Sequence, residues 1–403
     1  MSQSQTENQP KDPIVIVAAK RTPMGGFQGD FAPLSAPQLG AAAIKATLQS
    51  AGLDPARIDD VIMGCVLPAG QGQAPARQAA IGGGLPHSVG ATTINKMCGS
   101  GLKAVMMAHD EIQSGGQNIM LAGGMESMTN APYLLPKARG GYRMGHGAVI
   151  DHMFFDGLED AYHPGQLMGS FAENCARDYG FSRETQDEFA IRSLSRAQNA
   201  IQSGQFKNEI TPITVPSRGG DIIIEIDEQP GKARPDKIPT LKPAFAKDGT
   251  VTAANASSIS DGAAALILTR RSVAEKMGLE IRATIKGHST HAQAPELFTT
   301  APVGALKKLA EKTGWNLADI DLFEINEAFA VVTLAAMKDL DLPADKVNIH
   351  GGACALGHPI GASGARVLVT LLHALEHYDL KTGMASLCIG GGEAVAIAVE
   401  RSF

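Results

Sequence analysis

The chain has no long run of lysine and arginine along its 403 residues, and its net charge is −6. Surfaces that bind nucleic acids or anionic membranes need clustered basic residues, so the sequence argues against both kinds of partner. No apolar run approaches the roughly 18 residues that a membrane-spanning helix needs. The first dozen residues lack the pattern of a secretory signal or mitochondrial transit peptide, and the final Arg-Ser-Phe is not a peroxisomal address. We therefore expect a cytoplasmic protein.

Cysteine is scarce, with five residues in the whole chain. An odd, small number in a long sequence does not indicate a disulfide framework and fits a reducing compartment. No two cysteines have the Cys-x-x-Cys spacing of a structural zinc site, so the sequence predicts no metal.

The remaining composition is that of a globular protein, with 44% hydrophobic and 19% charged residues. That is enough apolar material for a packed core, and the length indicates two to three domains. Glycine is frequent, at 45 of 403 residues, which exceeds the usual ~7% and indicates many tight turns.

Apolar runs of strand length alternate with helical patterns in the first and last parts of the chain. We expect strands at 14–19, 58–63, 91–95, 118–122, 263–269, 385–389 and 394–399, and helices near 36–51, 74–82 and 102–112. This alternation predicts an α/β fold with a largely parallel sheet. The polar residues 1–12 are predicted to be a disordered N-terminus.

Residues 125–245 interrupt this alternation and are rich in Met, Gly, His and Pro. They contain one strongly helical stretch, 182–204, which we expect to open near a capping box of Ser182 and Gln186 and to end at a glycine. We interpret the segment as an inserted loop domain that covers a site.

A weak internal repeat relates the two parts of the chain that flank the inserted region. Residues 98–101, Cys-Gly-Ser-Gly, have a partner in Gly-Ala-Ser-Gly at 361–364, and each segment opens an apolar helix. The next strand ends in Gly-Gly both times, at 123–124 and at 390–391. The chain is therefore predicted to contain two similar halves, which comprise residues 13–124 plus 246–275 and residues 276–403.

Cys98 lies between an expected strand and an expected helix. Its thiol would sit at a helix N-terminus, where the helix dipole favours the nucleophilic thiolate. Gly99 and Gly101 leave the backbone uncrowded, so a bulky acyl group could approach. Position alone leaves a buried structural cysteine as the alternative, since cysteine is among the most buried residue types.

His358 lies in a glycine-dense segment, 348–364, which lacks the pattern of a phosphate-binding loop. It is either a base for a nucleophilic cysteine or a structural turn residue.

The segment Cys388-Ile-Gly-Gly-Gly ends a strand, and its backbone N–H groups could bind an oxyanion beside a second cysteine. Asn326 and Glu327 lie in an otherwise apolar stretch and belong either to a hydrogen-bond network or to a site.

The order of these motifs resembles the thiolase family over about residues 13–402. The motifs are NKMCGSGLKA (95–104), GGMESMTNAPYLL (123–135), VTAANASSISDGAAA (251–265), INEAFA (325–330), GGACALGHPIGASGAR (351–366) and CIGGG (388–392). The resemblance implies a five-layered α/β/α/β/α fold of two similar halves with the inserted loop domain, and a homotetramer built as a dimer of dimers.

The family pattern implies a role for each catalytic position. Cys98 would take the acyl group as a thioester, and His358 would activate it and help to hold the substrate thioester oxygen. Asn326 would fix a water molecule in that oxyanion site. Cys388 would move the proton at the α-carbon of acetyl-CoA, while the N–H groups of Cys98 and Gly390 would form a second oxyanion hole.

The family also implies a coenzyme A site. Ser257 would contact the pantetheine, Met168 would line the same tunnel, and Lys232 and Arg234 are the candidates for the nucleotide phosphates, with solvated surface charge as their alternative.

The sequence departs from the family at three positions. Leu167 stands where several relatives have histidine, Cys354 where an aliphatic residue is usual, and Glu393 where many relatives continue with small or apolar residues.

The implied reaction is the reversible Claisen condensation of two acetyl-CoA to acetoacetyl-CoA and CoA, through an acetyl thioester on Cys98 and in ping-pong order. Coenzyme A would be substrate and product, with no other cofactor. The alternative is a 3-ketoacyl-CoA thiolase of β-oxidation with a broader chain range. A ketoacyl carrier-protein synthase is disfavoured because Cys388 stands where that enzyme has histidine, and a non-catalytic CoA- or lipid-binding relative is disfavoured because Cys98, His358 and Cys388 are all present.

Overall fold

A ten-stranded mixed sheet forms the centre of the computed structural model, which describes residues 12–402. Its order is β12-β13-β14-β11-β1-β10-β5-β3-β4, and β2 pairs with β10. The strands are β1 Ile14–Arg21, β2 Gly25–Gly26, β3 Asp60–Gly64, β4 Gly90–Ile94, β5 Ile119–Ser127, β10 Ser260–Arg270, β11 Ala283–Ala292, β12 Leu322–Ile325, β13 Thr382–Ile389 and β14 Glu393–Glu400.

The sequence predicted a largely parallel sheet, and this prediction is wrong. Only β3–β4, β3–β5 and β12–β13 pair in parallel within this sheet, and its other pairs are antiparallel. The short glycine turn between β13 and β14 makes them a hairpin, and hairpin neighbours are antiparallel. The alternation of strands with helices could not reveal these additional pairings.

In the N-terminal half, the two faces of the strands pack on different helices. Val15 and Val17 pack with α1 (Ala36–Ala51) and α2 (Pro75–Gly82), whereas Ile14 and Ile16 pack with α3 (Ser100–Ser114). Helix α1 begins at a capping box in which Ser35 and Gln38 exchange hydrogen bonds, as its SAPQ sequence permits.

The C-terminal half repeats this arrangement. Met384 and its same-face neighbours pack with α8 (Ala301–Thr313) and α9 (Ala330–Leu340), whereas Ala385 and Leu387 pack with α11 (Ser363–His377). The two halves join through β1 and β11, where Val15 pairs with Thr284 and Ile16 with Ala283.

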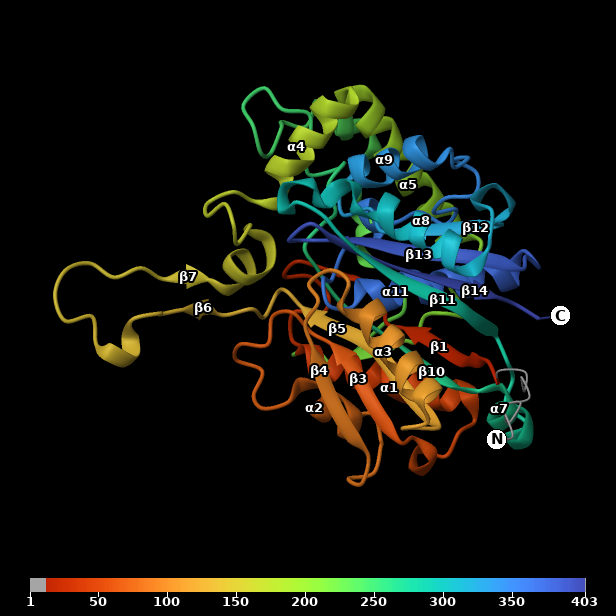
Figure 1. Cartoon of the computed structure of the whole chain (residues 1–403). Helices are drawn as coiled ribbons and strands as arrows, with labels where there is room; N and C mark the ends of the chain where they lie inside the picture. The colour runs from red at the N-terminus through yellow and green to blue at the C-terminus, as the bar shows by residue number, and fades with distance from the viewer. Residues whose placement is uncertain (1–11, 403) are drawn as a thin grey trace, which may run out of the picture.

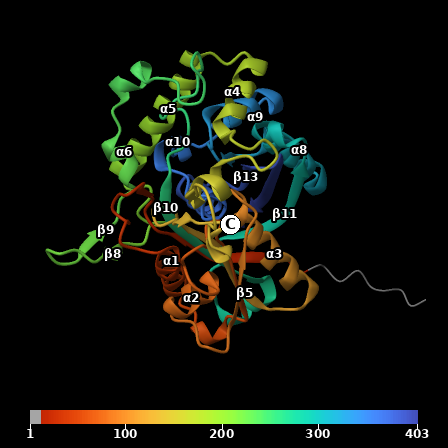
Figure 2. The ribbon, with the colours of Figure 1, turned by 90° about the vertical axis from the view of Figure 1, so that its left-hand side faces the viewer.

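Five layers result, which confirms the expected fold. From α1 and α2 in the lower part of Figure 1 the layers run through the N-terminal strands, α3 with α11, and the C-terminal strands to α8 and α9 (Figure 1). The turned view in Figure 2 shows the same outer helices on opposite sides of the centre. Because α3 and α11 lie inside, their buried residues contact strands of both halves.

The repeated segments, Cys-Gly-Ser-Gly at 98–101 and Gly-Ala-Ser-Gly at 361–364, meet where α3 and α11 begin. A Cβ on Gly101 would lie 2.6 Å from the backbone nitrogen of Ala365, and a Cβ on Gly364 would lie 2.3 Å from that of Leu102. The contacts are reciprocal, since Gly101 corresponds to Gly364 and Leu102 to Ala365 in the repeat. Only glycine allows the backbones to come this close.

The inserted region departs from the layers after β5, which continues to Ser127. It holds β6 (Tyr133–Leu134), β7 (Ile150–Asp151), β8 (Ile213–Val215) and β9 (Ile222–Ile224), with α4 (Met168–Tyr179), α5 (Arg183–Gln202) and α6 (Glu228–Lys232). Strands β6 and β7 form the stem of an arm that projects from the body (Figure 1). Helices α7 (Arg271–Met277) and α10 (Ala353–Leu356) complete the fold.

The capping box expected at Ser182 does not form. The Ser182 side chain accepts from the N–H of Thr185, whereas the buried Gln186 donates to the Thr250 hydroxyl. The helix ends at Gln202, before the expected glycine.

Residues 1–11, which belong to the N-terminus expected to be disordered, lie outside the described residues. Within residues 12–402, no helix is long and apolar enough to cross a membrane.

Candidate active site

A cavity of about 360 Å³ lies where both halves and the inserted region meet. Its wall is mainly apolar, which suits a ligand with an apolar arm. It is lined by Met97, Cys98, Phe154, Gly157, Leu158, Leu167, Met168, Gly169, Ala244, Phe245, Ala253, Ala256, Ser257, Ser258, Ile259, Phe298, Ala328, Phe329, His358, Ile360 and Gly390. The structure therefore brings five predicted site residues to one cavity, namely Cys98, His358, Gly390, Ser257 and Met168.

Cys98 lies two residues before the start of α3. Burial raises the pKa of its thiol to about 11, although hydrogen bonds from the backbone N–H groups of Gly390 and of Cys98 itself oppose the rise. The helix N-terminus therefore does not make the resting group a thiolate at neutral pH, contrary to the expectation from its position. A base must take the proton before the sulfur can act as a nucleophile.

His358 is suited to that task. Burial, with a smaller contribution from the charge of Arg366, lowers its pKa to about 3, so the ring is neutral at physiological pH. The hydroxyl of Ser363 donates to the carbonyl oxygen of Pro359 at 2.9 Å and lies 2.6 Å from Nδ1 of His358. The single hydroxyl proton is committed to Pro359, so Nδ1 must donate to Ser363 and Nε2 keeps its lone pair.

Asn326 lies at that free nitrogen, with its Nδ2 3.5 Å from Nε2 of His358. Its orientation is set by Arg366, whose Nη2 donates to Oδ1 of Asn326 at 3.4 Å. Arg366 also pairs with Glu324 at 3.6 Å, and all of these side chains are buried. Asn326 is thus both part of a hydrogen-bond network and next to the reacting groups, so the two sequence interpretations are compatible.

Cys388 lies at the end of β13, fully buried and behind the cavity wall that Gly390 forms. Burial raises the pKa of its thiol well above the usual range, and the neighbouring Cys98 raises it further. Cys98 is therefore close enough to Cys388 for its charge to affect the Cys388 thiol.

The two basic candidates are not at the cavity. Lys232 binds Glu228, and Arg234 pairs with Asp236 at 3.6 Å. Both basic side chains are largely exposed. Their exposure is consistent with solvated surface charge, and contact with the nucleotide phosphates stays a prediction.

Glu126 is a buried acid that the sequence reasoning missed. It accepts backbone N–H groups of Val66, Leu67 and Gly361 at 2.9, 3.2 and 2.9 Å. Burial raises its pKa to about 7 despite these hydrogen bonds. It joins the loop of Val66 and Leu67 to the loop of Gly361. Its signal in the sequence was a carboxylate directly after the apolar run 119–125.

Glu393 also acquires a structural explanation. Its carboxylate binds the ammonium group of Lys96, so the loop that carries Cys98 is tied to the turn that carries Gly390. Both side chains are about one-third exposed.

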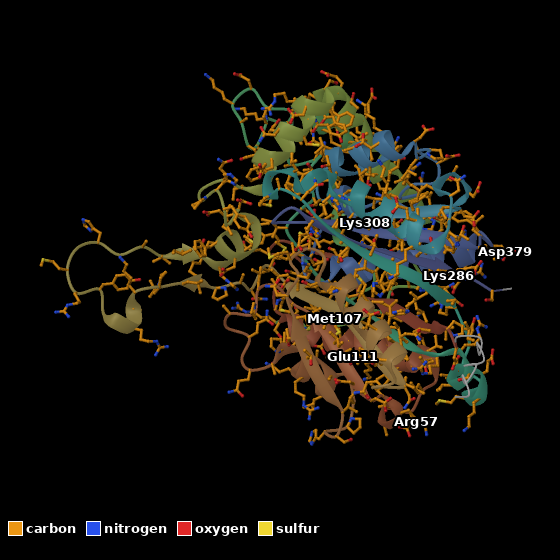
Figure 3. All side chains as sticks on the ribbon, viewed as in Figure 1. Arg57, Met107, Glu111, Lys286, Lys308 and Asp379 are labelled. Carbon is orange, nitrogen blue, oxygen red and sulfur yellow. The ribbon has the colours of Figure 1, made fainter. Side chains whose placement is uncertain are left out.

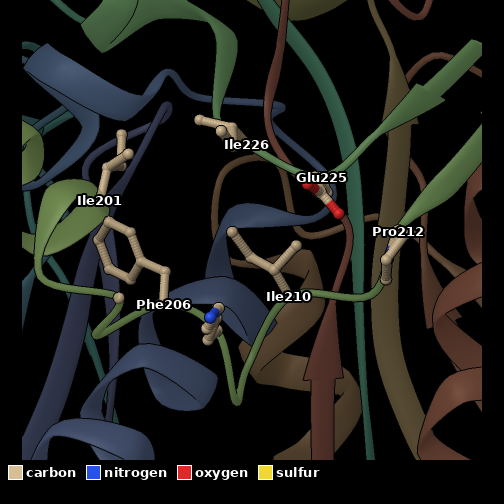
Figure 4. Close-up of a pocket in the computed structure, with 8 residues that line it drawn as sticks. Ile201, Phe206, Ile210, Pro212, Glu225 and Ile226 are labelled. Carbon is tan, nitrogen blue, oxygen red and sulfur yellow. The ribbon is translucent and has the colours of Figure 1, made fainter.

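A second cavity, of about 260 Å³, lies between the end of α5 and the β8–β9 hairpin (Figure 4). Its wall is mostly aliphatic, with Phe206, Lys207 and Glu225 among its members, and none of the candidate site residues lines it.

Comparison with known families agrees with this geometry. The model of the thiolase N-terminal domain matches residues 14–272, and that of the thiolase C-terminal domain matches 279–401. The chain belongs to the thiolase family. It is accordingly an acyltransferase, and its predicted fold and family are confirmed.

Individual thiolases resemble the chain over nearly its full length. The acetyl-CoA acetyltransferases of Cupriavidus necator and Pseudomonas aeruginosa are each 50% identical, over 96% of this chain and 99% of the relative. A probable acetyl-CoA acyltransferase of Staphylococcus aureus is 48% identical over the same shares. The crystal structure of the Bacillus anthracis acetyl-CoA acetyltransferase superposes with a TM-score of 0.94 at 41% identity, covering 97% of this chain and 99% of that one.

Proposed function

We propose that this thiolase is an acetyl-CoA C-acetyltransferase that interconverts two acetyl-CoA with acetoacetyl-CoA and CoA. The observation that carries the proposal is a protonated thiol, Cys98, on the same apolar cavity as a neutral histidine, His358. The names of the relatives at 50% identity support the same substrate.

The first half-reaction loads the enzyme. Nε2 of His358 takes the proton from Cys98, and the sulfur attacks the thioester carbonyl of acetyl-CoA. The CoA thiolate leaves with the proton. His358, assisted by a water molecule held by Asn326, stabilises the oxygen of the substrate, and the N–H groups of Cys98 and Gly390 face the sulfur and can stabilise the acetyl oxygen.

The second half-reaction forms the carbon–carbon bond. Cys388, as a thiolate, removes a proton from the α-carbon of a second acetyl-CoA, and the carbanion attacks the carbonyl carbon of the acetyl group on Cys98. The bond between that carbon and the Cys98 sulfur breaks, acetoacetyl-CoA is formed, and the departing Cys98 thiolate takes up the proton that Cys388 had removed. A charge on Cys98 would raise the pKa of Cys388, and this effect is absent both in the resting thiol and in the acetyl thioester. Acetylation keeps Cys98 from ionising, so no charge on Cys98 opposes the Cys388 thiolate during the second step.

The residues named supply the nucleophile, the bases and the oxyanion donors. We therefore propose that CoA is only substrate and product and that no further cofactor is required. Ser257 and Met168 are proposed to contact the pantetheine, since both line the cavity. Lys232 and Arg234 remain the weaker candidates for the nucleotide phosphates, because each already pairs with a carboxylate and neither lines the cavity.

The deciding experiment is thiolysis with free CoA and 3-ketoacyl-CoA substrates of increasing length. Cleavage of acetoacetyl-CoA with little cleavage of longer substrates supports the acetyltransferase. Comparable cleavage of the longer substrates moves the assignment to the broader 3-ketoacyl-CoA thiolase, which the relative named acyltransferase favours. If the enzyme cleaves none of these substrates, both the acetyltransferase and the broader thiolase assignment are wrong.

Two variants separate the half-reactions. Cys98→Ala should accept no acetyl group from labelled acetyl-CoA. Cys388→Ala should become labelled and then fail in condensation. Condensation by Cys388→Ala at a near-normal rate would require another base.

We further propose a homotetramer that works in the cytoplasm in fatty-acid metabolism. The projecting arm supports the assembly, because it exposes Tyr133, Leu135, Met144 and Val149. Sedimentation of the intact enzyme and of a chain with a shortened arm tests it. Smaller particles only for the shortened arm would support the proposal, and monomeric wild type would contradict it.

A further inference from the structure

Outside the catalytic cavity, two histidines and an aspartate from different elements converge. His109 and Asp110 lie in the second half of α3, and His288 lies on β11. Oδ1 of Asp110 is 3.0 Å from Nδ1 of His109 and 2.8 Å from Nε2 of His288. One ligand atom from each residue lies within 4.8 Å of the other two.

These spacings suit a small divalent cation. At a metal–nitrogen distance of about 2.1 Å, neighbouring ligands of a tetrahedral ion are about 3.4 Å apart. The observed 2.8 and 3.0 Å therefore need only a small opening of the three side chains. The imidazole rings meet edge to face at 85°, with centroids 5.0 Å apart, so they do not stack over the space that the ion would take.

The environment favours ligation by neutral imidazole. Burial lowers the pKa of His288, which outweighs the opposing effect of Asp110, and metals bind the deprotonated ring nitrogen. Burial tends to raise the pKa of Asp110, but the hydrogen bonds from His109 and His288 prevail and lower it, so the aspartate is ionised. The nearby cation is Lys312, whose ammonium donates to the carbonyl oxygen of His288 at 3.1 Å.

The cluster is accessible from solvent. The Asp110 side chain is 57% exposed, whereas those of His109 and His288 are 16% and 11% exposed. Figure 3 shows Met107 and Glu111 of α3 and Lys286 of β11, which are near His109, Asp110 and His288 in sequence, on the same face of the molecule. An ion could enter over Asp110 and keep water in its remaining position.

We propose that His109, Asp110 and His288 bind a divalent first-row transition metal, Zn²⁺ foremost, with water completing a tetrahedral site. Imidazole and carboxylate ligands suit this class of metal. The ion would join α3, which begins beside the nucleophile, to β11 of the C-terminal half. Its role would be structural, because the cluster is not part of the catalytic cavity.

The test is titration of chelator-treated intact enzyme with Co²⁺, followed by absorption, and with Zn²⁺, followed by calorimetry and thermal unfolding. The Cys98→Ala background removes the thiol that faces the cavity and could itself bind metal. We expect one equivalent of Co²⁺ with visible d–d bands and without the near-ultraviolet band of a cobalt–thiolate bond. Zn²⁺ should raise the unfolding temperature.

Three variants locate the site. His109→Gln with His288→Gln should abolish binding, and Asp110→Asn, a small change at an exposed side chain, should weaken it at least tenfold. His146→Gln, on the exposed arm, should bind like the parent. If the double variant does not fold, Asp110→Asn with the thermal shift still decides. A parent that binds no metal, binding by Asp110→Asn as tight as in the parent, or a thiolate band would each overturn the proposal.

Discussion

Ser363 accepts the Nδ1 proton of His358 over 2.6 Å while its own proton goes to the carbonyl oxygen of Pro359. This chain of two hydrogen bonds selects the tautomer that leaves Nε2 free to take a proton from the nucleophile. Ser363 begins α11, so the first turn of a central helix orients the base. Ser363 is therefore a positioning residue, and its effect is transmitted through His358.

Replacing Ser363 by alanine should lower kcat and leave KM nearly unchanged. Loss of a buried hydrogen-bond partner costs about 1–3 kcal/mol, which corresponds to a decrease of roughly fivefold to 150-fold. Steady-state thiolysis measures the effect. Thr47→Val is the matched control, since Thr47 is equally buried in α1 and bonds only backbone carbonyls of Ala43 and Ala265. An equal loss in both variants would refute the positioning role.

Alkylation of Cys98 should accelerate continuously with pH. Only the thiolate reacts, and burial raises the pKa of this thiol to about 11, so the thiolate fraction grows about tenfold per pH unit from pH 7 to 10. The neutral His358, with a pKa of about 3, adds no inflection in that range. Iodoacetamide kinetics on the free enzyme, with Cys98→Ala as control, give the profile. A plateau near pH 7 would instead reveal a thiolate–imidazolium pair.

Reversing the charge of Lys96 or Glu393 should impair catalysis, because their pair holds the nucleophile loop against the turn of Gly390. A partly exposed ion pair contributes up to about 1 kcal/mol, so each single reversal should lower kcat/KM by about twofold to fivefold. The double variant Lys96→Glu, Glu393→Lys should recover most of the activity. Lys381→Glu, which removes a pair with Glu400, should have no effect. No recovery in the double variant would argue against the pairing.

Gly101→Ala should destabilise the fold severely. The added Cβ would lie 2.6 Å from the backbone nitrogen of Ala365, and backbone cannot move aside as a flexible side chain can. Overpacking costs about 1–3 kcal/mol or more, measured by denaturant unfolding. Gly116→Ala is the control, since its Cβ would meet nothing closer than 3.6 Å, and it should stay within about 0.5 kcal/mol of wild type. Comparable stability of both variants would contradict the close crossing.

Local patterns predicted most of the individual elements. The helix 36–51 is reproduced to the residue as α1, and the strand 14–19 extends by two residues as β1. The repeated Ser-Gly pair at 100–101 and 363–364 correctly predicted two similar halves, because the close crossing requires glycine at equivalent positions in both. The sequence motifs predicted that His358 acts on Cys98, and both residues line the same cavity.

What escaped prediction depends on contacts between distant segments. Burial raises the pKa of Cys98 above the value that its position before a helix indicates, and that burial comes from elements remote in the chain. Glu126 was missed because its partners, among them Gly361, lie far away in sequence. The metal site proposed above would escape such sequence patterns too, because they describe closely spaced cysteines, whereas His109 and His288 come from separate elements.

The crossing of Gly101 and Gly364 also determines when the enzyme becomes chemically competent. The nucleophile precedes one crossing helix and its base precedes the other, about 260 residues later in the chain. Contacts between such distant segments form slowly, after local structure. During synthesis, therefore, the N-terminal half already carries Cys98 while the histidine that activates it has not yet been made. The reactive pair arises only upon docking of the two halves, so a growing chain cannot acylate itself prematurely.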